Sequence, residues 1–387
     1  MSVTAAKGFV AAGVKAGIRK SALDLAVVRT TVPAVGCAMF TTNQVQAAPV
    51  VVSKRHLEAA EPQAIVLNSG SANAATGAQG EADAVATAAE AARLLCLRTE
   101  EVLVASTGVI GVPLPMPKIL AGMHRAVRKL SPEGGAVAAE AIMTTDTHPK
   151  TAVVSRDGFT VGGMAKGAGM IHPALATMLC VVTTDYPLDA DEADAFLRPV
   201  VDASFNRISV DGECSTNDAV VLLANGASGI ERTPATDTSF AAALLQVCGE
   251  LSSQIVADGE GATMLLEIDV AGAASDAQAA AIARRIATSP LVKTAAFGRD
   301  ANWGRVLAAA GSAPYNGGFA TLDPAKVSLA FNGTAVFRGG APLGVEPSFE
   351  GSVCTIALDL GLGEGASSYL ASDLTYDYVR INADYRS

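Results

Sequence analysis

Residues 162–184 read GGMAKGAGMIHPALATMLCVVTT, a glycine-rich segment that leads into an apolar stretch. The glycines and the single lysine, Lys166, predict a loop over residues 162–170. The stretch Thr177–Thr184 is short, apolar and rich in β-branched residues, which predicts a buried strand. The glycine-rich segment lacks the G-x-x-x-x-G-K-[ST] order of a phosphate-binding loop, so we do not expect a nucleotide site.

A repeated order of strand, polar loop and helix precedes this segment. Ala64–Leu67 predicts a strand that runs into the polar loop Asn68–Asn73, and Glu101–Ala105 predicts a strand that ends in Ser106-Thr107-Gly108. We also predict a strand at Pro49–Ser53 and a hairpin formed by residues 151–155 and 159–161. Helices are predicted at residues 81–96 and 134–143, and a further helix is predicted to begin at about residue 118. This order predicts an α/β protein of packed layers whose loops at strand ends bind a ligand.

The chain has 387 residues, more than a single hydrophobic core usually serves. Helices are predicted near 189–205, 239–256 and 274–289, with a half-buried strand at 263–270 between the last two. The last third changes to short strands and turns. We therefore place a main domain at residues 1–269 and a smaller α+β domain at residues 270–387.

Composition excludes several classes of protein. The chain has 28 Lys and Arg against 38 Asp and Glu, a net charge of −10, and no basic run, so we expect no nucleic-acid partner. It shows no secretory signal and no apolar run of about 18 residues, so we expect a cytoplasmic protein without a membrane span. The six cysteines form no CxxC pair and the four histidines show no ligand spacing, which predicts reduced thiols and no metal.

The bond between Ala176 and Thr177 has the features of a self-cleavage site. A threonine is an effective nucleophile when a base lies nearby, and its own α-amino group serves once the chain is cut before it. The pKa of such an amine, about 8, needs little adjustment. Ala176 is small, the segment upstream is rich in glycine, and Thr177 opens a predicted buried strand. Taken alone, however, a threonine at a strand start is usually only a strand former.

The sequence KGAGMIHP at 166–173, followed by ATML at 176–179, resembles the cleavage-site signature of the ornithine acetyltransferase family, also called glutamate N-acetyltransferase or ArgJ. Further segments resemble the family in the same order across nearly the whole chain: 68–73, 106–108, 144–147, 209–218, 258–263, 297–305 and 380–385. The resemblance implies an α/β (α+β) fold, a layered αββα sandwich with a smaller C-terminal α+β domain. It also implies self-cleavage between Ala176 and Thr177 into an α chain of residues 1–176 and a β chain of residues 177–387, assembled as α2β2.

The activity implied by the resemblance belongs to arginine biosynthesis. In the family, acetyl moves from N2-acetyl-L-ornithine to L-glutamate by a ping-pong mechanism through an acetylated threonine, without metal or organic cofactor, and some members also take acetyl from acetyl-CoA. Carried over by position, Thr177 is the nucleophile, and Thr107 and Gly108 supply the oxyanion hole. The substrate-binding positions are Thr144, Lys166, Thr177, Glu260, Asn382 and Ser387.

The residue types suit this chemistry. A hydroxyl and a backbone N–H can stabilise the oxyanion of acyl transfer, and Lys166 is suited to a substrate α-carboxylate. Glu260 could pair with an ammonium group, so we assign it to ornithine recognition as a hypothesis. The sequence departs from the family at position 264, where Met264 replaces the usual lysine.

Two alternatives remain open. The same nucleophile with water as acceptor would give an aminopeptidase or amidase of related fold. A protein left uncut at Ala176–Thr177 would instead be a non-catalytic binder of amino acids.

Overall fold

The computed structural model describes residues 2–172 and 178–384. The chain divides into two compact units, which are described separately: within the described residues, the first holds 2–206 and 213–255, and the second holds 207–212 and 256–384. The division falls earlier in the chain than residue 270, and the short segment 207–212 belongs to the second unit although it lies far upstream of the rest.

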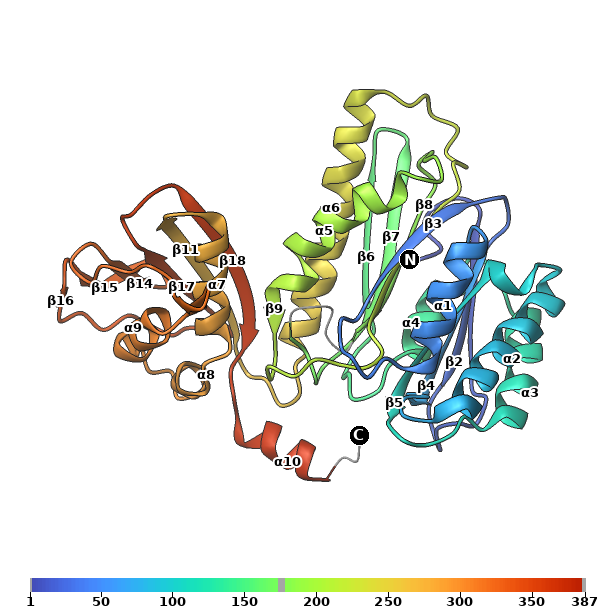
Figure 1. The fold of residues 1–387 in the computed structure, drawn as a ribbon, viewed down its shortest axis with the longest axis horizontal. Coiled ribbons are helices and arrows are strands. Elements are labelled where there is room, and N and C mark those ends of the chain that lie inside the picture. The colour runs from blue at the N-terminus through green and yellow to red at the C-terminus, as the bar shows by residue number, and fades with distance from the viewer. Residues whose placement is uncertain (1, 173–177, 385–387) are drawn as a thin grey trace. The chain divides into compact units, whose positions relative to one another are not determined.

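The first unit contains two stacked sheets (Figure 1). The four-stranded sheet has the order β1-β2-β4-β5 and the five-stranded sheet the order β3-β10-β8-β7-β6. Their strands are β1 Phe9–Val14, β2 Leu25–Thr30, β3 Val35–Phe40, β4 Ala64–Ser71, β5 Val102–Val109, β6 Lys150–Arg156, β7 Phe159–Lys166, β8 Leu179–Thr184 and β10 Ala219–Ala224. The helices of this unit are α1 Ala48–Ala59, α2 Gly77–Leu95, α3 Met116–Arg128, α4 Gly135–Ala141, α5 Ala193–Ala203 and α6 Pro234–Ala257.

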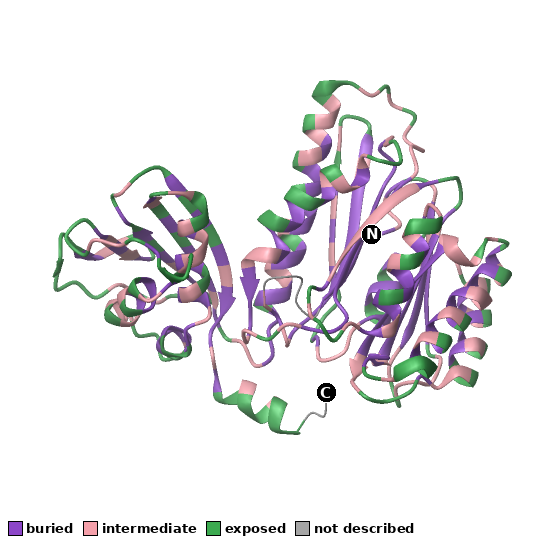
Figure 2. Ribbon diagram, viewed as in Figure 1, coloured by how far each residue is buried: buried purple, intermediate pink, exposed green. Residues whose placement is uncertain are grey.

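The strands are buried on both faces, which explains their nearly continuous apolar sequences. In β4, Ile65 and Leu67 face the core between the two sheets, while Val66 faces the helices that cover the four-stranded sheet. Helices α2 and α3 pack on that outer face, and Val247 and Leu251 of α6 lie against Gly163 of the five-stranded sheet. Figure 2 shows the strands buried along most of their length and the helices with exposed outer sides. The first unit is thus a four-layer αββα sandwich, which confirms the predicted fold class.

The second unit is built on a seven-stranded sheet of order β16-β15-β14-β17-β11-β18-β9. Its elements are β9 Ile208–Ser209, β11 Leu265–Ala273, β14 Ser328–Phe331, β15 Thr334–Arg338, β16 Ala341–Pro342, β17 Val353–Asp359, β18 Gly365–Ser372, the small pair β12 Pro314–Tyr315 and β13 Gly318–Phe319, and the helices α7 Asp276–Ala287, α8 Pro290–Phe297, α9 Trp303–Gly311 and α10 Tyr376–Asp384. One apolar core joins α7, α8 and α9 to the sheet. The unit is an α+β structure.

Two local predictions were wrong. Pro49–Ser53 is not a strand but the first part of α1, because Pro49 occupies the first helical turn, where no amide donor is needed. A short apolar run cannot by itself distinguish a strand from a buried helical segment. The predicted loop at 162–170 is partly strand, since β7 continues through Gly162 and Gly163 to Lys166. Glycine is required at 162 because a Cβ there would lie 2.3 Å from the Ser2 carbonyl oxygen.

Among the described helices, α6 alone is long and apolar enough to cross a membrane. Half of that stretch is buried inside the protein, as in the core helix of a soluble domain. Its polar side is also engaged: the Gln254 side chain accepts a hydrogen bond from the Thr151 amide and donates one to the Thr151 carbonyl oxygen. The helix is therefore weak evidence for a membrane span.

Candidate active site

The first group of candidate residues lies at one edge of the sandwich, where strands of both sheets end. Lys166, the last residue of β7, donates a hydrogen bond of 3.3 Å from Nζ to Oγ1 of Thr107 in β5. Both residues are only 2% exposed. Lys166 is in register with Leu179 at the start of β8, which in turn is in register with Ala219 at the start of β10. The contact therefore joins the two sheets at the edge where β8 begins.

Asp146 organises the loops around Lys166. One carboxylate oxygen, Oδ1, accepts hydrogen bonds of 2.7 Å from Lys150 Nζ and 2.7 Å from the Gly167 amide, and Oδ2 accepts one of 2.9 Å from the Thr144 amide. Burial by itself would raise the pKa of Asp146, but the Lys166 and Lys150 ammonium groups hold that pKa well below its usual range. The carboxylate is thus charged, and it fixes Thr144 and the start of the loop after β7 beside Lys166.

Gly108 follows Thr107 in β5 at a point where only glycine fits. Its φ is +131°, and a Cβ there would lie 2.4 Å from the carbonyl carbon of Gly70 and 2.7 Å from the Ser71 nitrogen. The register between β4 and β5 shifts at Ser71. This close approach of two backbones places the Thr107–Gly108 peptide at the irregular end of the parallel strand pair.

Amide side chains hold these strand ends together. Ser106 donates a 2.6 Å hydrogen bond to Asn68 Oδ1, and Asn217 Nδ2 donates to the carbonyl oxygens of Ser106, at 2.9 Å, and Ala72, at 2.6 Å. All three side chains are buried. The network connects β4 and β5 of one sheet with the segment that enters β10 of the other, so it supports the geometry around Thr107.

A second buried carboxyl, that of Asp218, lies at the same edge. Its Oδ1 accepts a hydrogen bond of 3.0 Å from the amide of Met178. Within the described residues, Oδ2 is buried without a hydrogen-bond partner. Burial raises the pKa of Asp218 well above its usual value, against the opposing effects of the Met178 amide, of Lys166 and of the nearby Ser215 and Thr41 hydroxyls. The pKa values of Asp146 and Asp218 are thus shifted in opposite directions within one site.

The second unit contains the remaining described candidates. Asn382 of α10 donates a hydrogen bond of 2.8 Å from Nδ2 to Oε2 of Glu260, which is largely buried. Met264 is 3% exposed and belongs to the apolar core of this unit. Its backbone amide and carbonyl group are hydrogen-bonded to Asp373. Position 264 in this chain therefore contributes packing rather than a polar contact.

The structure thus groups the candidates into two sets. Thr107, Gly108, Thr144 and Lys166 meet in the first unit, and Glu260 and Asn382 meet in the second. Ala176, Thr177 and Ser387 lie outside the described residues. Reasoning from sequence missed Asp146 and Asp218 as site residues. Asp146 lies in a loop and Lys150 begins β6, so their spacing of four residues was not a helical signal, and nothing in the sequence linked Asp218 to Met178.

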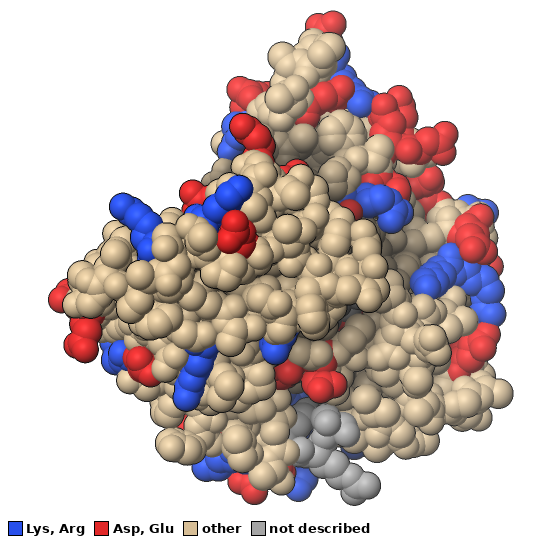
Figure 3. Space-filling view, turned by 60° about the vertical axis from the view of Figure 1, so that its left-hand side comes forward, with Lys and Arg blue, Asp and Glu red and all other residues tan. Residues whose placement is uncertain are grey.

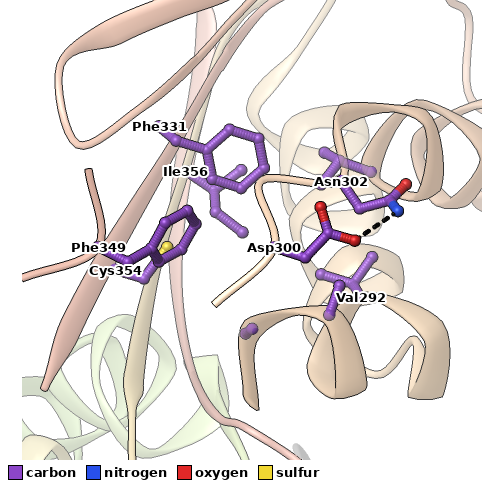
Figure 4. A pocket seen from close by; sticks show the side chains of 10 residues that line it. Val292, Asp300, Asn302, Phe331, Phe349, Cys354 and Ile356 are labelled. Atoms are coloured by element: carbon purple, nitrogen blue, oxygen red, sulfur yellow. Dashed lines mark hydrogen bonds between the residues drawn. The ribbon is translucent and has the colours of Figure 1, made fainter. Parts of the chain in front are cut away.

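The cavity drawn in Figure 4 is not a substrate site. It lies in the second unit between Phe331, Phe349, Cys354 and Ile356 on one side and Asp300, which accepts a hydrogen bond from Asn302, on the other. Its volume of about 10 Å³ is at most enough for one water molecule.

In the described part of the chain, no group of three His, Cys, Asp or Glu side chains could hold a metal ion. Acidic and basic side chains are interspersed over the face shown in Figure 3.

Comparison with known proteins identifies relatives over the whole length. The profile of the ArgJ family matches residues 10–387. The chain is 48% identical to the arginine biosynthesis bifunctional protein ArgJ of Symbiobacterium thermophilum, over 100% of this chain and 98% of that protein. It is 46% identical to the protein of the same name from Streptomyces coelicolor, over 100% of both. A crystal structure of ornithine acetyltransferase complexed with ornithine from Mycobacterium tuberculosis is 49% identical, with a TM-score of 0.44, and covers 45% of this chain and 96% of that chain.

The fold and the site define an αββα sandwich enzyme with a buried lysine, hydroxyl and carboxyl cluster at the strand ends. Its sequence matches make the assignment specific: the chain belongs to the ArgJ family, whose curated members are named as bifunctional proteins of arginine biosynthesis.

Proposed function

We propose that this enzyme cleaves itself between Ala176 and Thr177 and then transfers acetyl from N2-acetyl-L-ornithine to L-glutamate. The observation that carries the proposal is the buried Lys166–Thr107 hydrogen bond beside the charged Asp146. The hydroxyl of Thr107 and the ammonium group of Lys166 lie near the start of β8, since Lys166 is in register with Leu179, the first residue of that strand. Membership of the ArgJ family supports the same assignment.

The transfer proceeds in two half-reactions. Thr177 Oγ attacks the acetyl carbonyl carbon of N-acetylornithine while the α-amino group of Thr177 takes the hydroxyl proton. The oxyanion that forms is stabilised by the Thr107 hydroxyl and the Gly108 backbone amide. The C–N bond then breaks, ornithine leaves with the proton, and acetyl remains as an ester on Thr177. The amine of glutamate attacks this ester, the C–O bond breaks, and the proton returns to Oγ.

Self-cleavage uses the same hydroxyl nucleophile on the chain itself. Thr177 Oγ attacks the carbonyl carbon of Ala176, the peptide C–N bond breaks with transfer of a proton to the nitrogen, and an ester results. Water hydrolyses the ester, which frees the Ala176 carboxylate and the Thr177 amine. Cleavage therefore creates the base that the transfer reaction needs.

Substrate recognition is assigned to charged and polar side chains. Lys166 binds the α-carboxylate that both substrates share, and Thr144, fixed through Asp146, lines the same region. Glu260, oriented by Asn382, binds the side-chain ammonium group of ornithine. Ser387 completes the substrate-binding set. We further propose that acetyl-CoA can serve as a second acetyl donor, that the processed chains form α2β2, and that the enzyme is cytoplasmic and needs no metal or organic cofactor.

Mass spectrometry and a coupled assay test the proposal together. The wild-type protein should give two fragments that meet at Thr177, whereas T177A should remain a single chain. With N-acetylornithine and glutamate as substrates, the wild type should form ornithine and N-acetylglutamate in equal amounts. Release of acetate instead would favour the aminopeptidase or amidase alternative. An intact wild-type chain without transfer activity would favour a non-catalytic binder and overturn the proposal.

A further inference from the structure

Asp218 is held by several hydrogen bonds where the neighbouring strands β8 and β10 of the five-stranded sheet begin. Its carbonyl oxygen accepts a hydrogen bond of 3.1 Å from the Thr41 amide, and the amide of the next residue, Ala219, donates one of 3.1 Å to Met178. The Asp218 side chain makes a third contact, because its Oδ1 accepts a hydrogen bond of 3.0 Å from the Met178 amide. Asp218 therefore has its backbone fixed on two sides and its carboxyl directed at the nitrogen that is bonded to residue 177.

The Asp218 side chain is incompletely hydrogen-bonded within the described residues. Asp218 is fully buried, and its Oδ2 has no hydrogen-bond partner in the described part of the chain. A buried polar atom without a partner costs about 1–3 kcal/mol. Burial also raises the pKa of Asp218, so the neutral acid is favoured. A carboxyl kept in this state is unusual in a core and is typical of functional sites.

The raised pKa of Asp218 has a consequence for Lys166. Lys166 interacts electrostatically with both Asp146 and Asp218. Asp146 is charged and already binds Lys150 and two backbone amides. A second charged carboxylate would compete with a substrate carboxylate for Lys166 and would oppose an oxyanion forming nearby. An uncharged acid can hold the Met178 amide without that competition.

We propose that Asp218 is a positioning residue for acyl transfer, which acts through its hydrogen bond from the Met178 amide and fixes the start of the strand that follows the nucleophile. The inference rests on the proposed role of Thr177. Among the described residues, Lys166 and Cys214 are titratable groups that interact electrostatically with Asp218. The pKa of Cys214 is raised mainly by burial and further by Asp218. The hydroxyl groups of Ser215 and Thr41 also lie close enough to lower the pKa of Asp218, against the larger effect of burial.

The variants Asp218→Asn and Asp218→Ala test whether Asp218 positions the start of β8 for acyl transfer. Asparagine keeps an oxygen for the Met178 amide and is uncharged at every pH. We expect D218N to cleave itself and to keep kcat within about threefold of wild type at neutral pH. We expect D218A to lower kcat by roughly 10–100-fold with little change in KM, because a small displacement of a reacting group has effects of this size.

The pH profile gives a readout that a structural role would not affect. Activity of the wild type should decline on the alkaline side as Asp218 ionises, because the charged form competes for Lys166. D218N should lack that decline. The comparison of the wild type with D218N still tests the role of Asp218 if D218A fails to fold.

Asp185 provides a matched control. It is equally buried, follows the other end of β8, and accepts hydrogen bonds from the amides of Lys7 and Thr160. D185N should change thermal stability without altering the pH profile of kcat. The inference is overturned if D218A retains wild-type kcat, or if D218N loses as much activity as D218A. If T177A is itself active, the proposed function fails; if T177A is inactive while D218A is normal, only the role of Asp218 fails.

Discussion

Lys166 Nζ and Thr107 Oγ1 are 3.3 Å apart, although the two residues belong to different sheets. The cation that is suited to a carboxylate and the hydroxyl that is suited to an oxyanion are therefore parts of one buried contact. A change in either residue alters the position of the other.

Replacement of Thr107 tests the oxyanion assignment. T107V keeps the β-branched shape but removes the hydroxyl, and we expect kcat to fall by about 10²–10³, the usual loss when one oxyanion donor is removed. T107S restores the hydroxyl and should recover most of the rate. Steady-state kinetics of acetyl transfer measure the effect. Wild-type kcat in T107V would rule out a role for this hydroxyl.

Removal of the Asp146 charge should destabilise the first unit. D146N removes the carboxylate charge that pairs with the buried Lys150, and breaking such a pair costs about 3–5 kcal/mol. Because the folded-state pKa of Asp146 lies below the ordinary 3.8, its stabilisation is complete above that pH and is lost as the pH falls below it. Denaturant unfolding between pH 2 and 7 should give a smaller acid dependence in D146N than in wild type. Equal acid slopes in both proteins would contradict this account.

Glu260 is expected to discriminate between the two substrates. E260Q keeps the size and the hydrogen-bonding capacity toward Asn382 but loses the charge. We expect KM for N-acetylornithine to rise by roughly 10-fold or more, since hydrogen bonds to charged groups contribute about 1.5–3 kcal/mol, while KM for glutamate changes little. Kinetics with each substrate varied in turn provide the measurement, and an equal loss for both would remove Glu260 from ornithine recognition.

Lys293 should make the stability of the second unit depend on alkaline pH. Its ammonium group is buried and donates to the Ser372 carbonyl oxygen and hydroxyl, and burial lowers its pKa from 10.5 to about 8 despite Asp373 and Asp211. The unfolded chain therefore binds the proton more strongly, so stability should rise as the pH increases from 8 to 10.5. The free energy of unfolding of wild type should gain on the order of 3 kcal/mol relative to K293M over this range. The exposed Lys326→Met serves as the control, and parallel curves for wild type and K293M would disprove the effect.

The sequence predicted those elements that a local pattern defines. The hairpin of β6 and β7 was predicted, because alternation of side chains over a few residues is a local property. Pro49–Ser53 was misassigned because its packing partners, not its own composition, determine that it is helical. The end of β7 was misread as a loop for the same reason, since the glycines there are needed for close contact with Ser2 and α6.

The same limit applies to the site. Thr107, Gly108, Thr144 and Lys166 were proposed from a family resemblance, and the structure shows which of them lie together. Asp218 and Met178 are 40 residues apart, and their contact arises from the parallel pairing of β8 with β10. Only the tertiary fold defines such a relationship, so no short motif could have indicated it.

The strand order of the five-stranded sheet has a consequence for assembly. A cut before residue 177 would leave β3, β6 and β7 on one polypeptide and β8 and β10 on the other, and the sheet order β3-β10-β8-β7-β6 interleaves them. The two products would share a single hydrogen-bonded sheet and one core, so neither could leave without global unfolding. If the chain is cut there, we expect folding to precede cleavage, and fragments expressed from separate genes should not reconstitute the enzyme efficiently.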